Sequence, residues 1–337
     1  MRDRVSIFTN PRTILSGKFN YKETYQTFLR STNQKKEAAE VLRLLGDSIG
    51  KYIFPKDKTS NIVDLGCADG VPGLHYLKTL NPTGLCNYIG VENNDDFTKD
   101  ASLALSSSPL INDFSLINED PFSGLLSFNK ALASKKFAAV LISHAAYSIN
   151  DPAKCELILK DISNLIAPTG LAIFLHEKYV ENQFQYFRFK YGNFRVNDIA
   201  EKFELAAINS QSNQFQPIQF DSSLVFSPLS DEHWEAMKYP SQYNQINNVN
   251  FIANLERLSF IVQRDFLEME LDGSLSSYIE EVRAVIHNNN NQLDITNQLQ
   301  VFTAQNCIIT AEITRATNNL DQELKGNRPG YRLGAYE

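Results

Sequence analysis

The residues best suited to chemistry lie in one short turn, which reads Asp64, Leu65, Gly66, Cys67, Ala68, Asp69 and Gly70. A glycine at position 66 lets the backbone approach a ligand closely, because it carries no Cβ. The helix expected after the turn would offer unpaired N–H groups to a carboxylate. Asp64 and Asp69 suit an ammonium group and would repel a diphosphate. The turn is therefore expected to bind a methionine-like amino-acid tail.

Two apolar runs later in the chain also end in polar residues, namely Glu92 and Asn93 after the first and Glu119 and Asp120 after the second. A carboxylate at the tip of the second strand of such a sheet can accept hydrogen bonds from both hydroxyls of a ribose. Glu119 and Asp120 would meet the amino edge of an adenine. Asp120 directly precedes Pro121, so a helix cap is the favoured alternative for that residue.

Short apolar runs alternate with helical patterns, and this alternation would position the polar residues. The expected strands are 61–65, 88–91, 114–117, 137–142 and 171–175, with two further strands near 203–209 and 222–227. The pattern is typical of an α/β fold with a doubly wound, mostly parallel and Rossmann-like sheet, here of seven strands. Ligands bind at the carboxyl ends of the strands in such sheets, where the polar residues lie.

The segments around this sheet are expected to be helical. Residues 1–54 would form a lid segment and residues 55–229 the α/β domain. Residues 230–317 suggest helices whose apolar stripes suit a core or an interface, and residues 318–337 suggest a flexible tail. The C-terminal helices would contact substrate, a second copy of the chain or a protein partner.

Composition limits the classes of function. The 337 residues carry a formal net charge of −7, and 43 % of them are hydrophobic, as in globular proteins generally. An acidic chain has no general attraction to phosphate backbones, which disfavours a nucleic-acid substrate. There is no evident signal peptide, membrane span or cysteine–histidine spacing for zinc. We therefore expect a cytoplasmic protein that binds no nucleic acid, membrane or metal.

With these residues identified, the stretch from about 55 to 180 resembles the class I S-adenosylmethionine (SAM)-dependent methyltransferases. Positions 64–70 resemble their first motif, and Glu92 resembles their ribose-binding acid. The resemblance implies an enzyme that uses SAM and releases S-adenosylhomocysteine (SAH). The cofactor contacts that we expect are Asp64, Gly66, Cys67, Ala68, Asp69, Gly70, Glu92, Asn93, Glu119, Asp120 and Ser143.

A narrower resemblance concerns the N-terminal segment 19–29. This segment is similar to that of the histamine N-methyltransferase family, and plant-type carboxyl methyltransferases offer a comparable likeness. In the histamine family an aromatic-bearing helix folds over cofactor and substrate, which implies substrate contacts for Tyr21 and Tyr25. Ordinary packing on a helix face explains the same spacing. A longer C-terminal helical region and a different first motif separate this chain from that family, so the acceptor stays open.

Polar residues also follow the fourth and fifth expected strands, where this fold places the transferred methyl group. They are Ser143, His144 and Tyr147 after the fourth strand, and His176 and Glu177 after the fifth. His144 is the candidate base, because the pKa of histidine lies near neutrality. Tyr147 would orient the acceptor. A purely structural role is the alternative for His144.

Three functions fit these observations. The first is in-line transfer of a methyl group to a nitrogen or oxygen of a small molecule. The second is methylation of a protein that docks on the C-terminal helices. The third is a binding protein that keeps the fold without catalysis, against which the turn and Glu92 argue, because such a protein need not keep them.

Overall fold

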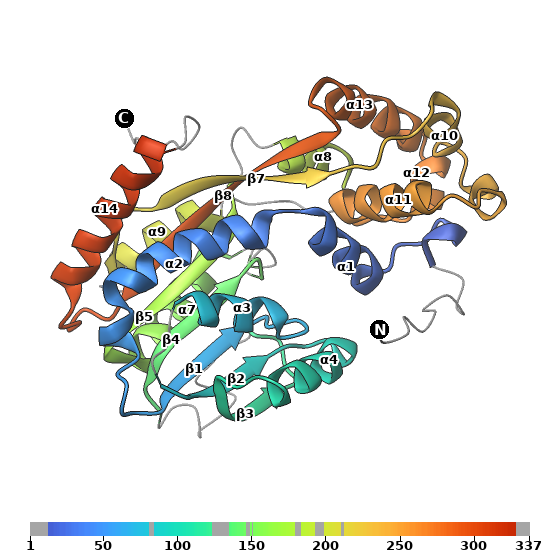
Figure 1. The fold of residues 1–337 in the computed structure, drawn as a ribbon. Helices are drawn as coiled ribbons and strands as arrows, with labels where there is room; N and C mark the ends of the chain where they lie inside the picture. The colour runs from blue at the N-terminus through green and yellow to red at the C-terminus, as the bar shows by residue number, and fades with distance from the viewer. Residues whose placement is uncertain are drawn as a thin grey trace, which may run out of the picture. The chain divides into compact units, whose positions relative to one another are not determined.

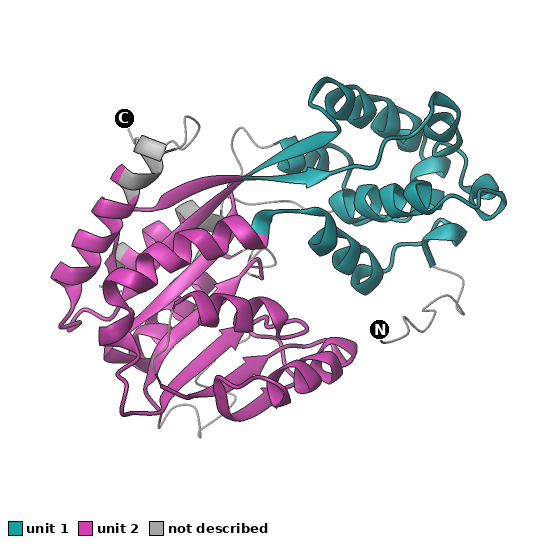
Figure 2. Cartoon of the chain, in the orientation of Figure 1, with its two compact units in different colours: residues 1–34, 179–196, 222–295 teal, residues 35–178, 197–221, 296–337 magenta. Residues whose placement is uncertain are grey.

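The computed structural model describes residues 13–80, 84–122, 135–145, 149, 151–178, 183–192, 199–209 and 212–327. The chain divides into two compact units (Figure 2). The helical unit comprises residues 1–34, 179–196 and 222–295, and the α/β unit comprises residues 35–178, 197–221 and 296–337. Each unit is therefore assembled from stretches that are far apart in the sequence.

A twisted sheet forms the centre of the α/β unit (Figure 1), and two of its strands continue into residues 222–225 and 292–295 of the helical unit. Its strands are β1 (Ser60–Leu65), β2 (Cys86–Val91), β3 (Ile111–Ile117), β4 (Phe137–Ser143), β5 (Ile166–Glu177), β6 (Asn213–Gln214), β7 (Ile218–Val225) and β8 (Gln292–Thr303). The order is β3-β2-β1-β4-β5-β8-β6, with β7 paired to β8. Strands β1 to β5 are parallel, and β8 is antiparallel to β5. The predicted doubly wound, mostly parallel α/β fold is confirmed.

Helices cover both faces of this sheet, and the described ones are α2 (Gln34–Ile53), α3 (Val71–Thr79), α4 (Asp95–Ser106), α7 (Pro152–Leu165), α9 (Ile199–Asn209) and α14 (Thr310–Asn327). Ile62 and Leu141 face residues of α2, α3 and α14. Val63 and Val140 face residues of α7 and α9. Burial on both faces explains why the central strands are continuous apolar runs. Because side chains alternate along a strand, Asp64 shares the face of Ile62.

The helical unit has a core of its own. Its helices are α1 (Tyr21–Ser31), α8 (Gln183–Tyr191), α10 (Asp231–Ala236), α11 (Val249–Val262), α12 (Phe266–Leu271) and α13 (Ser274–Asn288), with 3-10 helices at Thr13–Ser16 and Pro240–Gln245. The guanidinium of the buried Arg188 donates from Nε to the carbonyl oxygen of Ile261 at 3.1 Å and lies 4.6 Å from the ring centre of Phe184. This cation is thus accommodated by a carbonyl and an aromatic face.

The largest departure from the sequence expectation is β8, because residues 292–303 were expected to be helical. The buried strand carries Asn297, Gln298 and Gln300, and Nε2 of Gln300 donates to Oε1 of Glu204 in α9 at 3.1 Å. These polar residues mask the apolar pattern of a buried strand. Among the described residues the sheet has eight strands, where seven were expected.

Two further boundaries differ. The strand expected near 203–209 is part of helix α9, because a short apolar run fits the buried face of either element. Helix α14 continues to Asn327, past position 318, where a tail was expected; residues 328–337 lie outside the described part.

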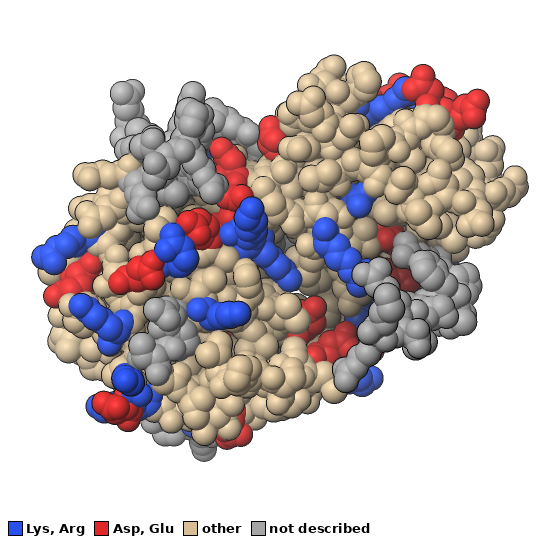
Figure 3. Space-filling model, viewed as in Figure 1, with Lys and Arg blue, Asp and Glu red and all other residues tan. Residues whose placement is uncertain are grey.

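Within the described ranges no helix is long and apolar enough to cross a bilayer. Figure 3 shows acidic and basic side chains interspersed over the visible face of the α/β unit.

Candidate functional site

The turn after β1 adopts a backbone conformation that favours glycine. Gly66 and Gly70 have φ angles of +76° and +72°, and Ala68 between them has φ +47°. A Cβ on Gly66 would lie 2.3 Å from the Cβ of Ala145, in the loop after β4. Gly66 is therefore required both by its backbone angle and by the close approach of a second loop. Helix α3 begins immediately after the turn, so its N-terminus opens there.

Backbone hydrogen bonds tie the turn to the end of β2. The N–H groups of Gly66 and Cys67 both donate to the carbonyl oxygen of Val91, at 2.8 and 3.2 Å. The N–H of Ala68 donates to Oε2 of Glu92 at 3.0 Å. These donors are used within the protein, so a ligand at the turn must be held mainly by the surrounding side chains and by the start of α3.

Three carboxylates surround the buried thiol of Cys67. Burial raises the pKa of Cys67, and the charges of Asp64, Glu92 and Asp69 raise it further. The thiol is therefore neutral at physiological pH, and it fills space beneath the turn. The charges of Asp64, Glu92 and Asp69 therefore all act on this one thiol.

Glu92 lies at the carboxyl end of β2 and binds two backbone segments. Its Oε2 accepts from Ala68, and its Oε1 accepts from the N–H of Asn94 at 3.0 Å. Burial raises the pKa of Glu92, and the backbone hydrogen bonds oppose that shift. An ionised carboxylate has about four lone-pair sites. The backbone donors of Glu92 are Ala68, Asn94 and Asn93, so the carboxylate can still accept a hydrogen bond from a ligand. Asn93, next to Glu92, is exposed.

Asp64 is almost completely buried, with 2 % of its surface exposed. The phenol of Tyr88, on β2, donates a hydrogen bond to Oδ2 of Asp64. Burial raises the pKa of Asp64 to about 7; the hydrogen bond from Tyr88 lowers it, and the charge of Glu92 raises it. Asp64 is therefore a carboxyl group that changes charge near neutral pH, which the sequence did not predict.

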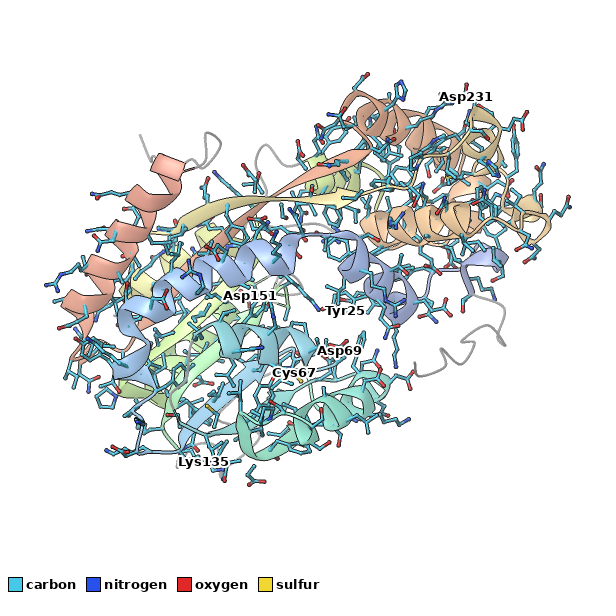
Figure 4. All side chains as sticks on the ribbon, in the orientation of Figure 1. Tyr25, Cys67, Asp69, Lys135, Asp151 and Asp231 are labelled. Carbon is cyan, nitrogen blue, oxygen red and sulfur yellow. The ribbon has the colours of Figure 1, made fainter. Side chains whose placement is uncertain are left out.

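Asp69 is the more accessible acid of the turn. Its Oδ1 accepts from the N–H of Val71 at 3.2 Å, which satisfies one of the free donors at the start of α3. Figure 4 labels Asp69 and Cys67, which lie at the N-terminal end of α3. This position suits contact with the amino group of an amino-acid ligand.

Lys35 also acts electrostatically on this turn, and no sequence pattern marks it as a site residue. It lies in the first turn of α2, whose residue Gly46 packs against Leu80 at the end of α3. Burial lowers the pKa of Lys35, and the charge of Asp69 raises it. The charge of Lys35 in turn helps lower the pKa of His75 on α3, after the larger effect of burial. A half-buried cation is therefore within electrostatic reach of Asp69, one of the acids of the turn.

The end of β3 carries an acceptor that the described protein does not use. Oε2 of Glu119 is buried and has no hydrogen-bond partner within the described residues. Such an atom is costly unless a ligand or water satisfies it, and an adenine amino group is a matching donor. Asp120 instead accepts from the N–H of Phe122 at 2.9 Å, as expected of a residue that caps a turn.

The ends of β4 and β5 bring Ser143, His144 and His176 together. Ser143 pairs in register with Leu175, and the N–H of His144 donates to the carbonyl oxygen of Leu175 at 2.7 Å. The side chain of Ser143 is hydrogen-bonded to the phenol of Tyr76 on α3. His144 has φ +53°, which is uncommon for a residue with a side chain.

His176 and Glu177 lie at the end of β5, and both are buried. Burial lowers the pKa of His176 to about 3, so its ring stays neutral under physiological conditions. Nε2 of His176 has no hydrogen-bond partner within the described residues. The remaining residue expected here, Tyr147, lies outside the described part of the chain.

Tyr21 and Tyr25 belong to the helical unit. Their rings stack at 5.6 Å with an interplanar angle of 7°, and both lie about 6 Å from the ring of Phe260 on α11. Tyr21 keeps 42 % of its surface exposed. Packing within the unit thus explains in part why Tyr21 and Tyr25 stand four residues apart. Contact of these rings with a substrate stays a prediction.

No family model and no curated protein sequence matches this chain. Among solved structures, a SAM-dependent methyltransferase from Clostridium acetobutylicum is similar at 14 % identity, with 59 % of this chain and 89 % of that chain covered and a TM-score of 0.42. A cyclopropane synthase from Mycobacterium tuberculosis is similar at 11 % identity, with 79 % and 83 % covered and a TM-score of 0.42. A cyclopropane-fatty-acyl-phospholipid synthase-like protein from Lactobacillus casei is similar at 10 % identity, with 78 % and 90 % covered and a TM-score of 0.42.

Proposed function

We propose that this chain is a SAM-dependent methyltransferase. The observation that carries the proposal is the placement of Asp64, Glu92 and Glu119 at the carboxyl ends of the adjacent parallel strands β1, β2 and β3. These are positions where open α/β sheets bind ligands. The three acids follow the order of three groups in one molecule: an amino-acid tail, a ribose and an adenine.

The residues fit each of these groups. Asp64 and Asp69 would attract the ammonium of the tail, and the start of α3 and Lys35 would attract its carboxylate. The carboxylate of Glu92 would accept from the ribose hydroxyls, and the unused Oε2 of Glu119 would accept from the adenine amino group. Bound SAM would supply a methyl group on a sulfonium, which is transferred by in-line displacement.

The proposed acceptor is a nitrogen or oxygen of a small molecule. His144, in the loop after β4, and His176, at the end of β5, support this assignment because an acceptor would meet the methyl group there. His144 would take a proton that the acceptor must lose, and the neutral His176 would form a hydrogen bond with the acceptor. An amine and a carboxyl acceptor, the two that the narrower resemblances imply, are both compatible with this chemistry.

The test is a calorimetric titration of the purified full chain with SAH, followed by incubation with methyl-labelled SAM and a cell extract. We expect SAH to bind in the micromolar range and the label to enter the small-molecule fraction. Label in protein would show that the acceptor is a protein. Absence of SAH binding at millimolar concentration would refute the proposal.

Lys35→Met should weaken SAH binding about tenfold, because a charge-assisted hydrogen bond to the ligand carboxylate contributes about 1.5–3 kcal/mol. The variant should bind 5′-methylthioadenosine, which lacks the amino-acid tail, as tightly as the parent does. Lys36→Met is the matched control, since Lys36 is the exposed neighbour on α2. Equal losses for both ligands would mean that Lys35 only supports the fold.

A further inference from the structure

Asp64 and Tyr88 form a buried hydrogen-bonded pair, and the residue of α3 that covers this pair is a glycine. Tyr88 is fully buried, and its phenol reaches along the sheet face from β2 to Oδ2 of Asp64 on β1. Helix α3 covers the pair at Gly73, where a Cβ would lie 2.1 Å from Oδ2 and 2.5 Å from the phenol oxygen. A glycine at position 73 therefore makes room for this hydrogen bond.

An apolar residue at position 88 would fill the same space and leave Asp64 without its donor. A buried carboxyl group without donors takes up a proton and becomes neutral. A neutral Asp64 would no longer attract the ammonium of an amino-acid ligand, whereas an ionised one acts strongly in a buried, low-dielectric site. Tyr88 thus controls a charge at the proposed cofactor site without itself reaching the ligand.

We propose that Tyr88 is a positioning residue for cofactor binding, whose phenol keeps Asp64 in the carboxylate form that attracts the ammonium group of SAM and SAH. The inference rests on the proposed function, and it assigns a role to a residue outside the turn. It also makes cofactor affinity depend on pH near neutrality.

The sign of this dependence follows from the groups around Asp64. Tyr88 from β2 and Tyr76 from α3 interact with it, as do Cys67 and the nearby carboxylate of Glu92. Burial raises the pKa of Asp64 to about 7, so the carboxylate is lost as the pH falls through 7. SAH affinity should therefore weaken on acidification below pH 7. Without the hydrogen bond from Tyr88 the pKa would be higher still.

The test compares SAH with 5′-methylthioadenosine between pH 5.5 and 8.5, in the parent and in Tyr88→Phe. Both ligands carry the ribose and the adenine, so protonation of Glu92 should change both affinities by the same factor. The ratio of the two affinities therefore does not depend on the protonation state of Glu92. In the parent the ratio should fall about tenfold as Asp64 is protonated. In Tyr88→Phe the midpoint should move up by about one to two pH units, because a hydrogen bond to a charged group contributes about 1.5–3 kcal/mol.

A second variant separates this role from packing. Asp64→Asn should abolish the pH dependence of the ratio, and adding Tyr88→Phe to it should cause no further change in the ratio. An unchanged midpoint in Tyr88→Phe, with SAH still bound by the parent, would overturn the role of Tyr88 and leave the proposed function standing. No SAH binding by the parent at any pH would overturn both.

Discussion

Gly66→Ala should abolish measurable SAH binding and lower the melting temperature of the protein by roughly 4–24 °C. A residue with a Cβ at φ +76° is strained by about 1–3 kcal/mol. The new methyl group would also lie 2.3 Å from the Cβ of Ala145, and such overpacking adds about 1–3 kcal/mol. For a unit of this size each kcal/mol lowers the melting temperature by about 2–4 °C. Calorimetry on the parent and the variant measures both effects.

Two further variants separate the causes. Gly273 has φ +78°, yet no atom lies within 4 Å of a Cβ added there. Gly273→Ala should therefore show the cost of the backbone angle alone and leave SAH affinity unchanged. In the double variant Gly66→Ala, Ala145→Gly the collision is removed, so part of the stability and of the binding should return. If the double variant behaved like Gly66→Ala alone, the close approach of the loop after β4 would not be the reason why position 66 needs a glycine.

Four of the five parallel strands, β1, β2, β4 and β5, could be predicted from the sequence because they are largely buried. In β3, at the edge of the sheet, no residue is fully buried, and only its second half, 114–117, was expected. Burial on both faces produces short runs of apolar residues, such as 137–142, that local pattern reveals. Strand β8 is buried as well, but Asn297 and Gln300 within it interrupt the apolar run. The partner of Gln300 is Glu204 in α9, which is distant in the sequence, and no local pattern indicates that such a partner exists.

The residues of the candidate site also divide into those that local sequence reveals and those that depend on contacts between distant parts of the chain. Gly66, Asp69 and Glu92 were predicted as site residues because the turn and the strand tips are local features with recognisable chemistry. Tyr88 and Lys35 were not, because their roles depend on which side chains β2 and α2 bring next to the turn. Lys35 is one of two adjacent lysines, and only the packing of α2 along α3 distinguishes it from the exposed Lys36.

Glu92→Gln should weaken SAH binding by about 10- to 100-fold while the protein stays folded. The amide keeps one oxygen that can accept from Ala68 or Asn94, so the turn retains a connection to the end of β2. The amide cannot accept on both sides as the carboxylate does, and it carries no charge. Loss of a charge-assisted contact to the ribose hydroxyls costs about 1.5–3 kcal/mol.

The choice of ligand makes this prediction specific to the ribose. SAH and 5′-methylthioadenosine share the ribose, so Glu92→Gln should weaken both by the same factor, in contrast to Lys35→Met, which should weaken only SAH. Asp113→Asn, an exposed acid on β3, is the control for a general loss of negative charge and should leave both affinities unchanged. If Glu92→Gln weakened SAH alone, Glu92 would contact the amino-acid tail, and the order of subsites along β1, β2 and β3 would have to be reassigned.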